Sequence, residues 1–185
     1  MKEKPEIRLI NYIQNDSWML EILTIVKNLQ LNDCWIGAGF IRNKVWDVLH
    51  AIERTKLNDI DVIYFNADAT EKEKVLHIEF FLKTMYPTLN WSVKNQARMH
   101  LRNNHQPYLN CHHAISFWPE TATAVAVRLN HKNRIEYLAP YGLDDLFNLI
   151  VTPTPQFDIT VYNQRIQAKA WAKKWNLLIF KKLTP

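Results

Sequence analysis

Two aspartates separated by a single residue are the first candidates for chemistry in this sequence. Asp59 and Asp61 flank Ile60 at the start of an apolar run that continues to Phe65. Because side chains alternate along a strand, both aspartates are predicted to lie on one face, about 7 Å apart at Cα. Two such carboxylates repel each other unless a cation lies between them, and oxygen ligands of this kind suit Mg²⁺. The alternative is a pair of solvated acids at the end of a strand.

A glycine pair precedes these aspartates and suggests a site for an anion. Only three glycines occur in the chain, and Gly37 and Gly39 flank Ala38 between an apolar stretch at 34–36 and a helical pattern. Glycine allows a phosphate to approach the backbone, and the N-terminus of a helix attracts an anion. Arg42 in the first helical turn adds a charge-assisted contact. The alternative is a tight packing turn with a solvated arginine, since the third glycine of the dinucleotide-binding pattern is missing.

The elements expected around these residues alternate between helix and strand. Hydrophobic spacing predicts strands at 34–36, 60–65, 90–94, 121–129 and 135–139, and helices at 16–29, 40–52, 70–85, 95–104, 143–150 and 161–178. Asp16 or Ser17 is the expected cap of the first helix, and Thr70 with Glu73 forms a predicted capping box. We therefore expect an α+β fold with a mixed β-sheet flanked by helices, in which residues 1–150 form a head domain and residues 151–185 a C-terminal helical extension packed on it.

Composition and charge restrict the class of protein. The 185 residues are 48% hydrophobic, which is enough for a sizeable core, and the net charge of +5 favours acidic partners such as nucleotides or nucleic acid. Cys34 and Cys111 are too far apart to form a metal-binding pair, so a disulfide scaffold and a zinc ribbon are not expected. The sequence contains neither an apolar run long enough to span a membrane nor a signal peptide, and we expect a cytoplasmic protein without a membrane partner.

Basic residues near aromatic residues form a second candidate surface. No acid occurs from residue 92 to residue 119, where Lys94, Arg98 and Arg102 lie close to several aromatic residues. These three side chains are candidates for contacts with an acceptor or with phosphate. The alternative is a solvated basic face over an aromatic core. Residues 163–185 also lack acids, and their basic side chains are candidates for contacts with triphosphate or RNA. The alternative is a solvated helix face, which applies more to the terminal lysines than to Arg165.

The order of these motifs resembles the DNA polymerase β-like nucleotidyltransferase superfamily. In its CCA-adding enzyme and poly(A) polymerase branch, a head motif G-G-x-x-R-D precedes D-x-D, and here Gly37-Ala38-Gly39-Phe40-Ile41-Arg42-Asn43 precedes Asp59-Ile60-Asp61. A further segment of that branch, G-G-x-x-D-L followed by a phenylalanine and a basic helix, resembles Tyr141-Gly142-Leu143-Asp144-Asp145-Leu146 followed by Phe157, Arg165 and Lys169. From about residue 15 to residue 180, the chain is also similar to a small bacterial family of stand-alone nucleotidyltransferase-like proteins.

The resemblance implies a polymerase β-like fold and a transfer reaction. It implies that Asp59 and Asp61 are catalytic and bind Mg²⁺, or alternatively Mn²⁺, and that an NTP is the donor. It also assigns nucleotide binding to the Gly37–Gly39 turn, including Ala38, and to Arg42, Asn43 and Arg165. The metal would activate an attacking hydroxyl and neutralise charge on the phosphates. The acceptor remains open among RNA, a protein hydroxyl and a small molecule.

Several departures from the pattern favour a second hypothesis. Asn43 replaces the acid of the head motif, and the expected strand at 90–94 has no third carboxylate, so that Asn95, Glu120 and Glu136 are the remaining candidates for it. The acids of the base-selecting E-D-x-x-R helix are replaced by Val161 and Tyr162. With no room for the parts that hold tRNA, CCA addition itself is not expected. The alternative function is a catalytically inactive module of the same fold that binds nucleotide, RNA or a protein.

Overall fold

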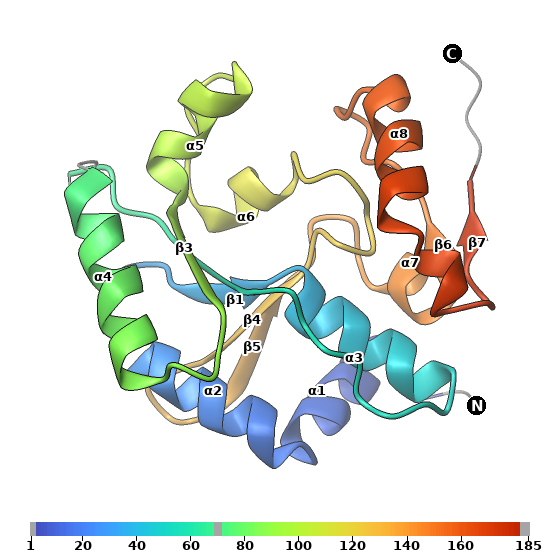
Figure 1. The fold of residues 1–185 in the computed structure, drawn as a ribbon, viewed down its shortest axis with the longest axis horizontal. Coiled ribbons are helices and arrows are strands. Elements are labelled where there is room, and N and C mark those ends of the chain that lie inside the picture. Colours follow the sequence, from blue (N-terminus) through green and yellow to red (C-terminus); the bar gives the residue numbers. More distant parts are fainter. Residues whose placement is uncertain (1–2, 69–71, 182–185) are drawn as a thin grey trace.

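A five-stranded mixed sheet forms the centre of the protein. The computed structural model describes residues 3–68 and 72–181 of the chain, and Figure 1 shows their fold. The strand order is β3-β2-β1-β4-β5, in which β2 and β3 are parallel and the other neighbours are antiparallel. The strands are β1 (Trp35–Gly37), β2 (Ile60–Tyr64), β3 (Trp91–Asn95), β4 (Ala126–Leu129) and β5 (Ile135–Leu138). The expected α+β fold with a mixed sheet is confirmed.

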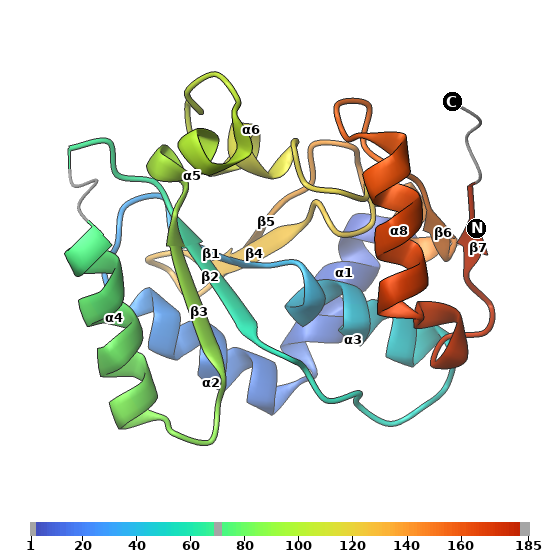
Figure 2. The same cartoon turned by 45° about the horizontal axis from the view of Figure 1, so that its top comes forward.

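Helices cover both sides of this sheet. They are α1 (Pro5–Gln14), α2 (Ser17–Lys27), α3 (Gly39–Leu49), α4 (Lys72–Met85), α5 (Gln96–Asn103), α6 (Cys111–Ile115), α7 (Asp144–Phe147) and α8 (Ile159–Lys169). In both views α1 and α2 lie on one side of the sheet and α5 and α6 on the other (Figures 1 and 2). A 3₁₀ turn (Trp171–Lys173) follows α8, and two short parallel strands, β6 (Ile150–Val151) and β7 (Ile179–Phe180), form a second sheet. None of the described helices is both long and apolar enough to cross a membrane.

The N-terminus of α2 illustrates how polar residues set the boundaries of these elements. As expected, Asp16 caps the helix, and its carboxylate accepts a hydrogen bond from Met19 N–H at 3.1 Å. Lys44 and Arg54 form ion pairs with the same carboxylate, at 2.9 Å and 2.6 Å. Hydrogen bonds to the charged form and nearby cations lower the pKa of Asp16, although its burial acts in the opposite direction. The cap therefore also connects α2 to α3 and to the segment that precedes β2.

The C-terminal segment differs from the long helix predicted at 161–178. Helix α8 ends at Lys169 because Ala170 adopts a left-handed conformation, with φ 48° and ψ 35°. The chain then turns so that Trp171 and Trp175 pack edge-on against Trp46 of α3, with ring centroids 5.3 Å and 5.1 Å away. The indole N–H of Trp175 also donates to the buried carboxylate of Asp47 at 2.8 Å. The helical spacing of the tryptophans thus reflects packing against α3 rather than one continuous helix.

Several shorter differences have local causes. Helices α1 and α6 both occupy stretches in which the sequence predicts no helix or strand. The strand predicted at 121–129 begins only at Ala126, because Thr123 and Ala124 N–H donate to the carbonyl of Glu120 and form a turn. The helix predicted at 143–150 ends at Phe147, and Ile150 lies in β6. The predicted capping box at Thr70 lies outside the described residues.

Candidate active site

Strand β1 leads directly into α3 through the glycine pair. The aromatic ring of Trp118 occupies the side-chain position of Gly37, where a Cβ would lie 2.5 Å from its Cη2 atom. Ala38 caps the helix with φ 53° and ψ −120°, a conformation that favours glycine. Its carbonyl accepts the N–H groups of Ile41 and Arg42. The first amides of a helix have no carbonyl partner within it, so those of Gly39 and Phe40 are available to an anion.

Asp59 immediately precedes β2 and Asp61 lies within it, beside this helix terminus. Asp61 is in register with Gly37 on one side and with Ser92 of β3 on the other. Both aspartates line one cavity of about 470 Å³. Burial and the charge of Asp59 raise the pKa of Asp61, while a hydrogen bond to Ser92 and the cations Lys94 and Arg42 act in the opposite direction. The two carboxylates therefore repel each other in a partly desolvated site, as two ligands of one cation would.

The same cavity brings together most of the predicted nucleotide-binding residues. Ala38, Gly39, Arg42, Asn43 and Arg165 all line it. Gly37 is not among its lining residues, and its side-chain position is taken by Trp118. Four lysines complete the wall: Lys56, Lys169, Lys173 and Lys174. Six cationic side chains thus line the cavity together with two acids, a balance that suits a polyphosphate.

Arg42 is buried and held from several sides. Its guanidinium donates to Thr123 Oγ1 at 2.9 Å and to Asn43 Oδ1 at 3.0 Å. The guanidinium carbon lies 4.4 Å from the ring centroid of Trp171 and 5.2 Å from that of Trp46. Burial lowers the pKa of Arg42 to about 10, so the side chain remains cationic at neutral pH. Asn43, which replaces the acid of the resembled motif, thus orients this arginine through its amide oxygen.

A second cavity of about 230 Å³ also borders Asp61. It shares Ala38, Asp61, Thr123 and Arg165 with the first cavity, and Lys94 contributes to its wall. Arg98 and Arg102, the other two candidates for acceptor contacts, lie on α5 and line neither cavity. The structure therefore places Lys94 near the aspartates and the two arginines farther along α5.

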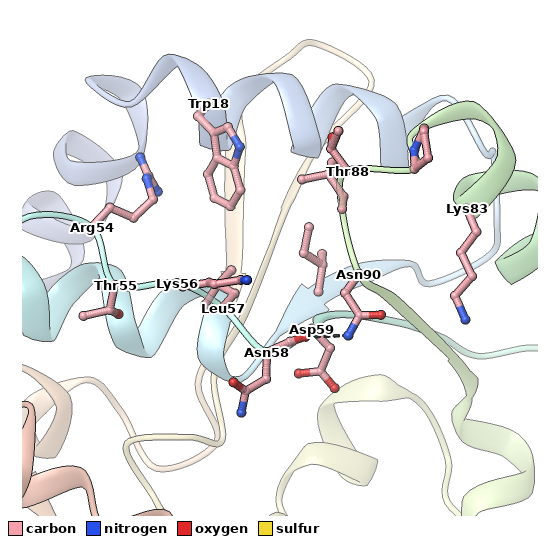
Figure 3. Close-up of a pocket in the computed structure, with 13 residues that line it drawn as sticks. Trp18, Arg54, Thr55, Lys56, Leu57, Asn58, Asp59, Lys83, Thr88 and Asn90 are labelled. Atoms are coloured by element: carbon pink, nitrogen blue, oxygen red, sulfur yellow. Dashed lines mark hydrogen bonds between the residues drawn. The ribbon is translucent and has the colours of Figure 1, made fainter.

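A larger cavity of about 850 Å³ lies beyond the segment that leads into β2, between α2 and the end of α4 (Figure 3). The carboxylate of Asp59 points away from its Trp18 wall. Arg54 is already paired with Asp16 and lies 4.3 Å from the ring centroid of Trp18. The side-chain amide of Asn90 donates to the backbone carbonyl of Asn58 at 2.5 Å. These polar groups hold the loop in place, and the cavity borders the aspartate site, because Lys56, Leu57, Asn58 and Asp59 line both cavities.

None of the three remaining candidates supplies a third carboxylate or amide ligand beside the aspartates. The side-chain oxygen of Asn95 accepts from the N–H groups of Asn66 and Ala97 and caps α5. Glu120 is paired with Arg165, and Glu136 with Arg128 across β4 and β5. Within residues 3–68 and 72–181, no three acidic, histidine or cysteine side chains form a group able to hold a metal ion. A metal ion would therefore have two carboxylate ligands here.

Some residues of the site have no local signature in the sequence. Trp171 falls within the helix predicted at 161–178, and its ring lies against the guanidinium of Arg42. Thr123 binds Arg42 from a turn that the sequence predicted as a strand. Lys173 and Lys174 line the cavity although a solvated face was the favoured interpretation. Two sequence features indicated this cationic wall: the absence of acids from residue 163 onward, and the resembled basic helix with Arg165 and Lys169.

Comparisons with known proteins agree with this architecture. The sequence profile of a family described as nucleotidyltransferase matches residues 24–180. An NMR structure described as revealing a CCA-adding enzyme head domain is 37% identical, with a TM-score of 0.86, and the match covers 99% of this chain and 98% of that one. No curated protein sequence matches the chain.

Two more distant structures show the fold alone. The Thermotoga maritima CCA-adding enzyme complexed with tRNA is 15% identical, with a TM-score of 0.59, over 98% of this chain and 43% of that one. A CCA-adding enzyme in complex with CTP is 13% identical, with a TM-score of 0.61, over 98% of this chain and 44% of that one. The chain thus spans less than half the length of these two enzymes.

Proposed function

Because the chain belongs to the nucleotidyltransferase family, we propose that it transfers a nucleotidyl group from an NTP to a hydroxyl acceptor. The observation that supports this most is the shared cavity, in which Asp59 and Asp61 face a cationic wall beside the N-terminus of α3. Such a reaction requires carboxylates that bind a cation and cationic groups that bind a polyphosphate, and this cavity contains both. The proposal thus rests on the arrangement of charge in one place.

The aspartate pair fits a divalent cation, which we propose to be Mg²⁺ or Mn²⁺. Mg²⁺ is commonly bound through one or two carboxylates together with substrate phosphates, so a site with two acids is sufficient. Burial and the charge of Asp59 raise the pKa of Asp61, and a bound cation would offset the repulsion between the two carboxylates. When bound, the metal supplies charge neutralisation at the phosphates and lowers the pKa of a coordinated hydroxyl.

The protein's own residues would bind and orient the donor. The amides of Gly39 and Phe40 and the positive end of the α3 dipole would accept the triphosphate. Arg42 is held by Thr123 and Asn43 and needs little reorganisation to face a phosphate. Arg165 would approach the same phosphates from α8. Binding in this pocket would bring the α-phosphate close to the aspartates.

The acceptor would approach from the second cavity. In phosphoryl transfer the attacking and leaving oxygens lie roughly in line, so an acceptor hydroxyl must lie opposite the pyrophosphate. The smaller cavity also borders Asp61, and its wall includes Lys94 but none of the four lysines of the cationic cavity, so we assign the acceptor to it. Structures of similar CCA-adding enzymes contain tRNA, CTP or ATP. For this chain, RNA, a protein hydroxyl and a small molecule remain the acceptor classes to test.

The test follows the label of the α-phosphate. NTPs labelled at the α- or the γ-phosphate are incubated with Mg²⁺ and, separately, with total RNA, a protein extract or small hydroxyl compounds. Nucleotidyl transfer moves the α-label to an acceptor and never the γ-label, and Asp61→Asn abolishes it. Asp68→Asn is the matched control, because Asp68 is exposed beyond the other end of β2. Transfer of the γ-label, or equal transfer by Asp61→Asn, would refute the proposed reaction.

The inactive binding module is the second candidate, and the missing third carboxylate favours it. Among the described residues, no third acid joins Asp59 and Asp61. This module would bind an NTP in the same cavity without moving the α-label to any acceptor. Binding without transfer in every acceptor pool therefore identifies the module, and binding with α-label transfer identifies the enzyme.

A further inference from the structure

Glu120 is a fully buried acid that the aspartate site does not use directly. Its exposed fraction is 0%, and it lies between α6 and β4, where it forms an isolated bridge with Pro153. Its backbone carbonyl accepts the N–H groups of Thr123 and Ala124. The backbone is therefore fixed on both sides, and the direction of the side chain is fixed with it.

The carboxylate of Glu120 makes one short contact and leaves one oxygen unpaired. Its Oε1 atom accepts a hydrogen bond from Nε of Arg165 at 2.5 Å. Its Oε2 atom is buried and has no hydrogen-bond partner within the described part of the chain. A buried carboxylate that is only partly satisfied costs stability, and apolar residues often replace a buried ion pair without loss. Stability alone therefore gives no reason for an acid at this position.

Glu120 instead determines which part of Arg165 faces the site. The contact uses Nε, and the two terminal nitrogens of the planar guanidinium carry its other four N–H donors. The arginine lines both the cationic cavity and the smaller cavity beside Asp61. Its side chain is 29% exposed, so it is accessible to a ligand, whereas Glu120 is not.

Two arginines share one aromatic ring in this region. The guanidinium carbons of Arg42 and Arg165 lie 4.4 Å and 5.8 Å from the ring centroid of Trp171. Arg165 lowers the pKa of Arg42 and Glu120 raises it, so the acid offsets the repulsion between the two cations. Without a negative charge here, two arginines converging on one cavity would repel each other.

We propose that Glu120 is a positioning residue, which holds Arg165 beside Arg42 so that the pair grips the polyphosphate of the donor. The proposal rests on the proposed function for the identity of the ligand. It assigns to Glu120 neither a contact with the substrate nor a bond to the metal. Its effect on binding passes entirely through Arg165.

Binding of inorganic tripolyphosphate and of the tightest-binding NTP, measured by titration calorimetry, tests this role. Glu120→Gln keeps the shape and removes the charge, and we expect roughly tenfold weaker binding of both ligands. Arg165→Gln should weaken binding by at least as much. The double variant should bind no more weakly than Arg165→Gln alone, because Glu120 acts only through Arg165. A merely structural role would give independent losses instead.

Glu136→Gln is the matched control, because this acid on β5 also pairs with an arginine, Arg128, and lines neither cavity beside Asp61. It should leave both affinities unchanged. Glu120→Asp retains the charge at a shorter reach and provides a second variant if Glu120→Gln folds poorly; we expect it also to weaken binding. Unfolding of both Glu120 variants would make the residue structural and overturn the proposal.

The two proposals fail in different ways. Tripolyphosphate binding that depends on Glu120, without any transfer of the α-label, supports the positioning role and refutes the transferase activity. NTP binding that is equally tight in wild type and Glu120→Gln overturns the positioning role and leaves the transferase proposal intact. If the wild-type protein binds neither ligand, no phosphate site exists for Glu120 to build, and the positioning role is overturned as well.

Discussion

Replacement of Ala38 by glycine provides a sensitive test of the geometry at the start of α3. Ala38 caps this helix with φ 53° and ψ −120°, although a side chain disfavours that conformation. It also lines both cavities beside Asp61. Ala38→Gly removes the Cβ atom and leaves the backbone hydrogen bonds to Val125, Ile41 and Arg42 in place. The change therefore isolates the backbone strain at the site.

Two opposing terms determine the expected effect. A non-glycine residue held in such a sparsely populated region costs of order 1–3 kcal/mol, which glycine would release. Glycine adds about 0.5–1 kcal/mol of backbone entropy that is lost on folding. The net result should be a gain in the free energy of unfolding of about 1 kcal/mol. For a chain of this size, that gain should raise the melting temperature by about 2–4 °C.

Thermal denaturation followed by circular dichroism measures this gain. Ala168→Gly is the matched control, because Ala168 is exposed within α8 and the same atoms are removed there. In a regular helix the change should destabilise the protein by about 1 kcal/mol. The two alanine-to-glycine variants should therefore shift the melting temperature in opposite directions. If Ala38→Gly lowers it as Ala168→Gly does, Ala38 is not strained and the described geometry of the helix start is wrong.

Three further predictions concern the surroundings of the site. Gly37→Ala places a Cβ atom 2.5 Å from the ring of Trp118, so overpacking should lower the free energy of unfolding, measured in urea, by about 1–3 kcal/mol. A variant as stable as wild type would contradict this contact. Trp175→Phe removes the hydrogen bond to the buried Asp47 and should cost about 2 kcal/mol in the same assay, and a cost near zero would argue against it. The raised pKa of Asp61 means that its ionisation opposes folding, and this cost appears as the pH rises above the ordinary value of 3.8. The melting temperature of Asp61→Asn minus that of wild type should therefore increase as the pH rises from about 4 to about 7. A difference that decreases over this range would refute the repulsion.

The centre of the candidate site could be predicted because its residues are close in sequence or follow a strand period. Gly39 and Arg42 lie in one helical turn, and Asp59 and Asp61 are two residues apart at the start of β2, so local rules are sufficient to group each pair. The sheet then places both pairs in one cavity. The resemblance to a known family predicted that the two pairs lie together, and the register of β1 with β2 gives the physical reason.

The residues that hold the arginines of the site in place could not be predicted, because their contacts join segments that are distant in the sequence. Glu120 and Arg165 are 45 residues apart, and neither lies in a pattern that indicates the other. Trp171 reaches Arg42 only because Ala170 ends α8 in a left-handed conformation. Glycine or asparagine commonly marks such a turn in a sequence, whereas alanine gives no indication of it. Helical spacing therefore predicted one long helix where the chain reverses.

The most direct test of the central claim is the binding of the four NTPs as a function of divalent metal concentration. Titration calorimetry compares wild type with the double variant Asp59→Asn/Asp61→Asn, at the same temperature and ionic strength. We expect wild type to bind at least one NTP more tightly with Mg²⁺ or Mn²⁺ than without it, and the double variant to lose that metal dependence while it keeps its fold. Metal-independent binding by wild type, or equal metal dependence in the double variant, would contradict the assignment of the aspartates as the metal site.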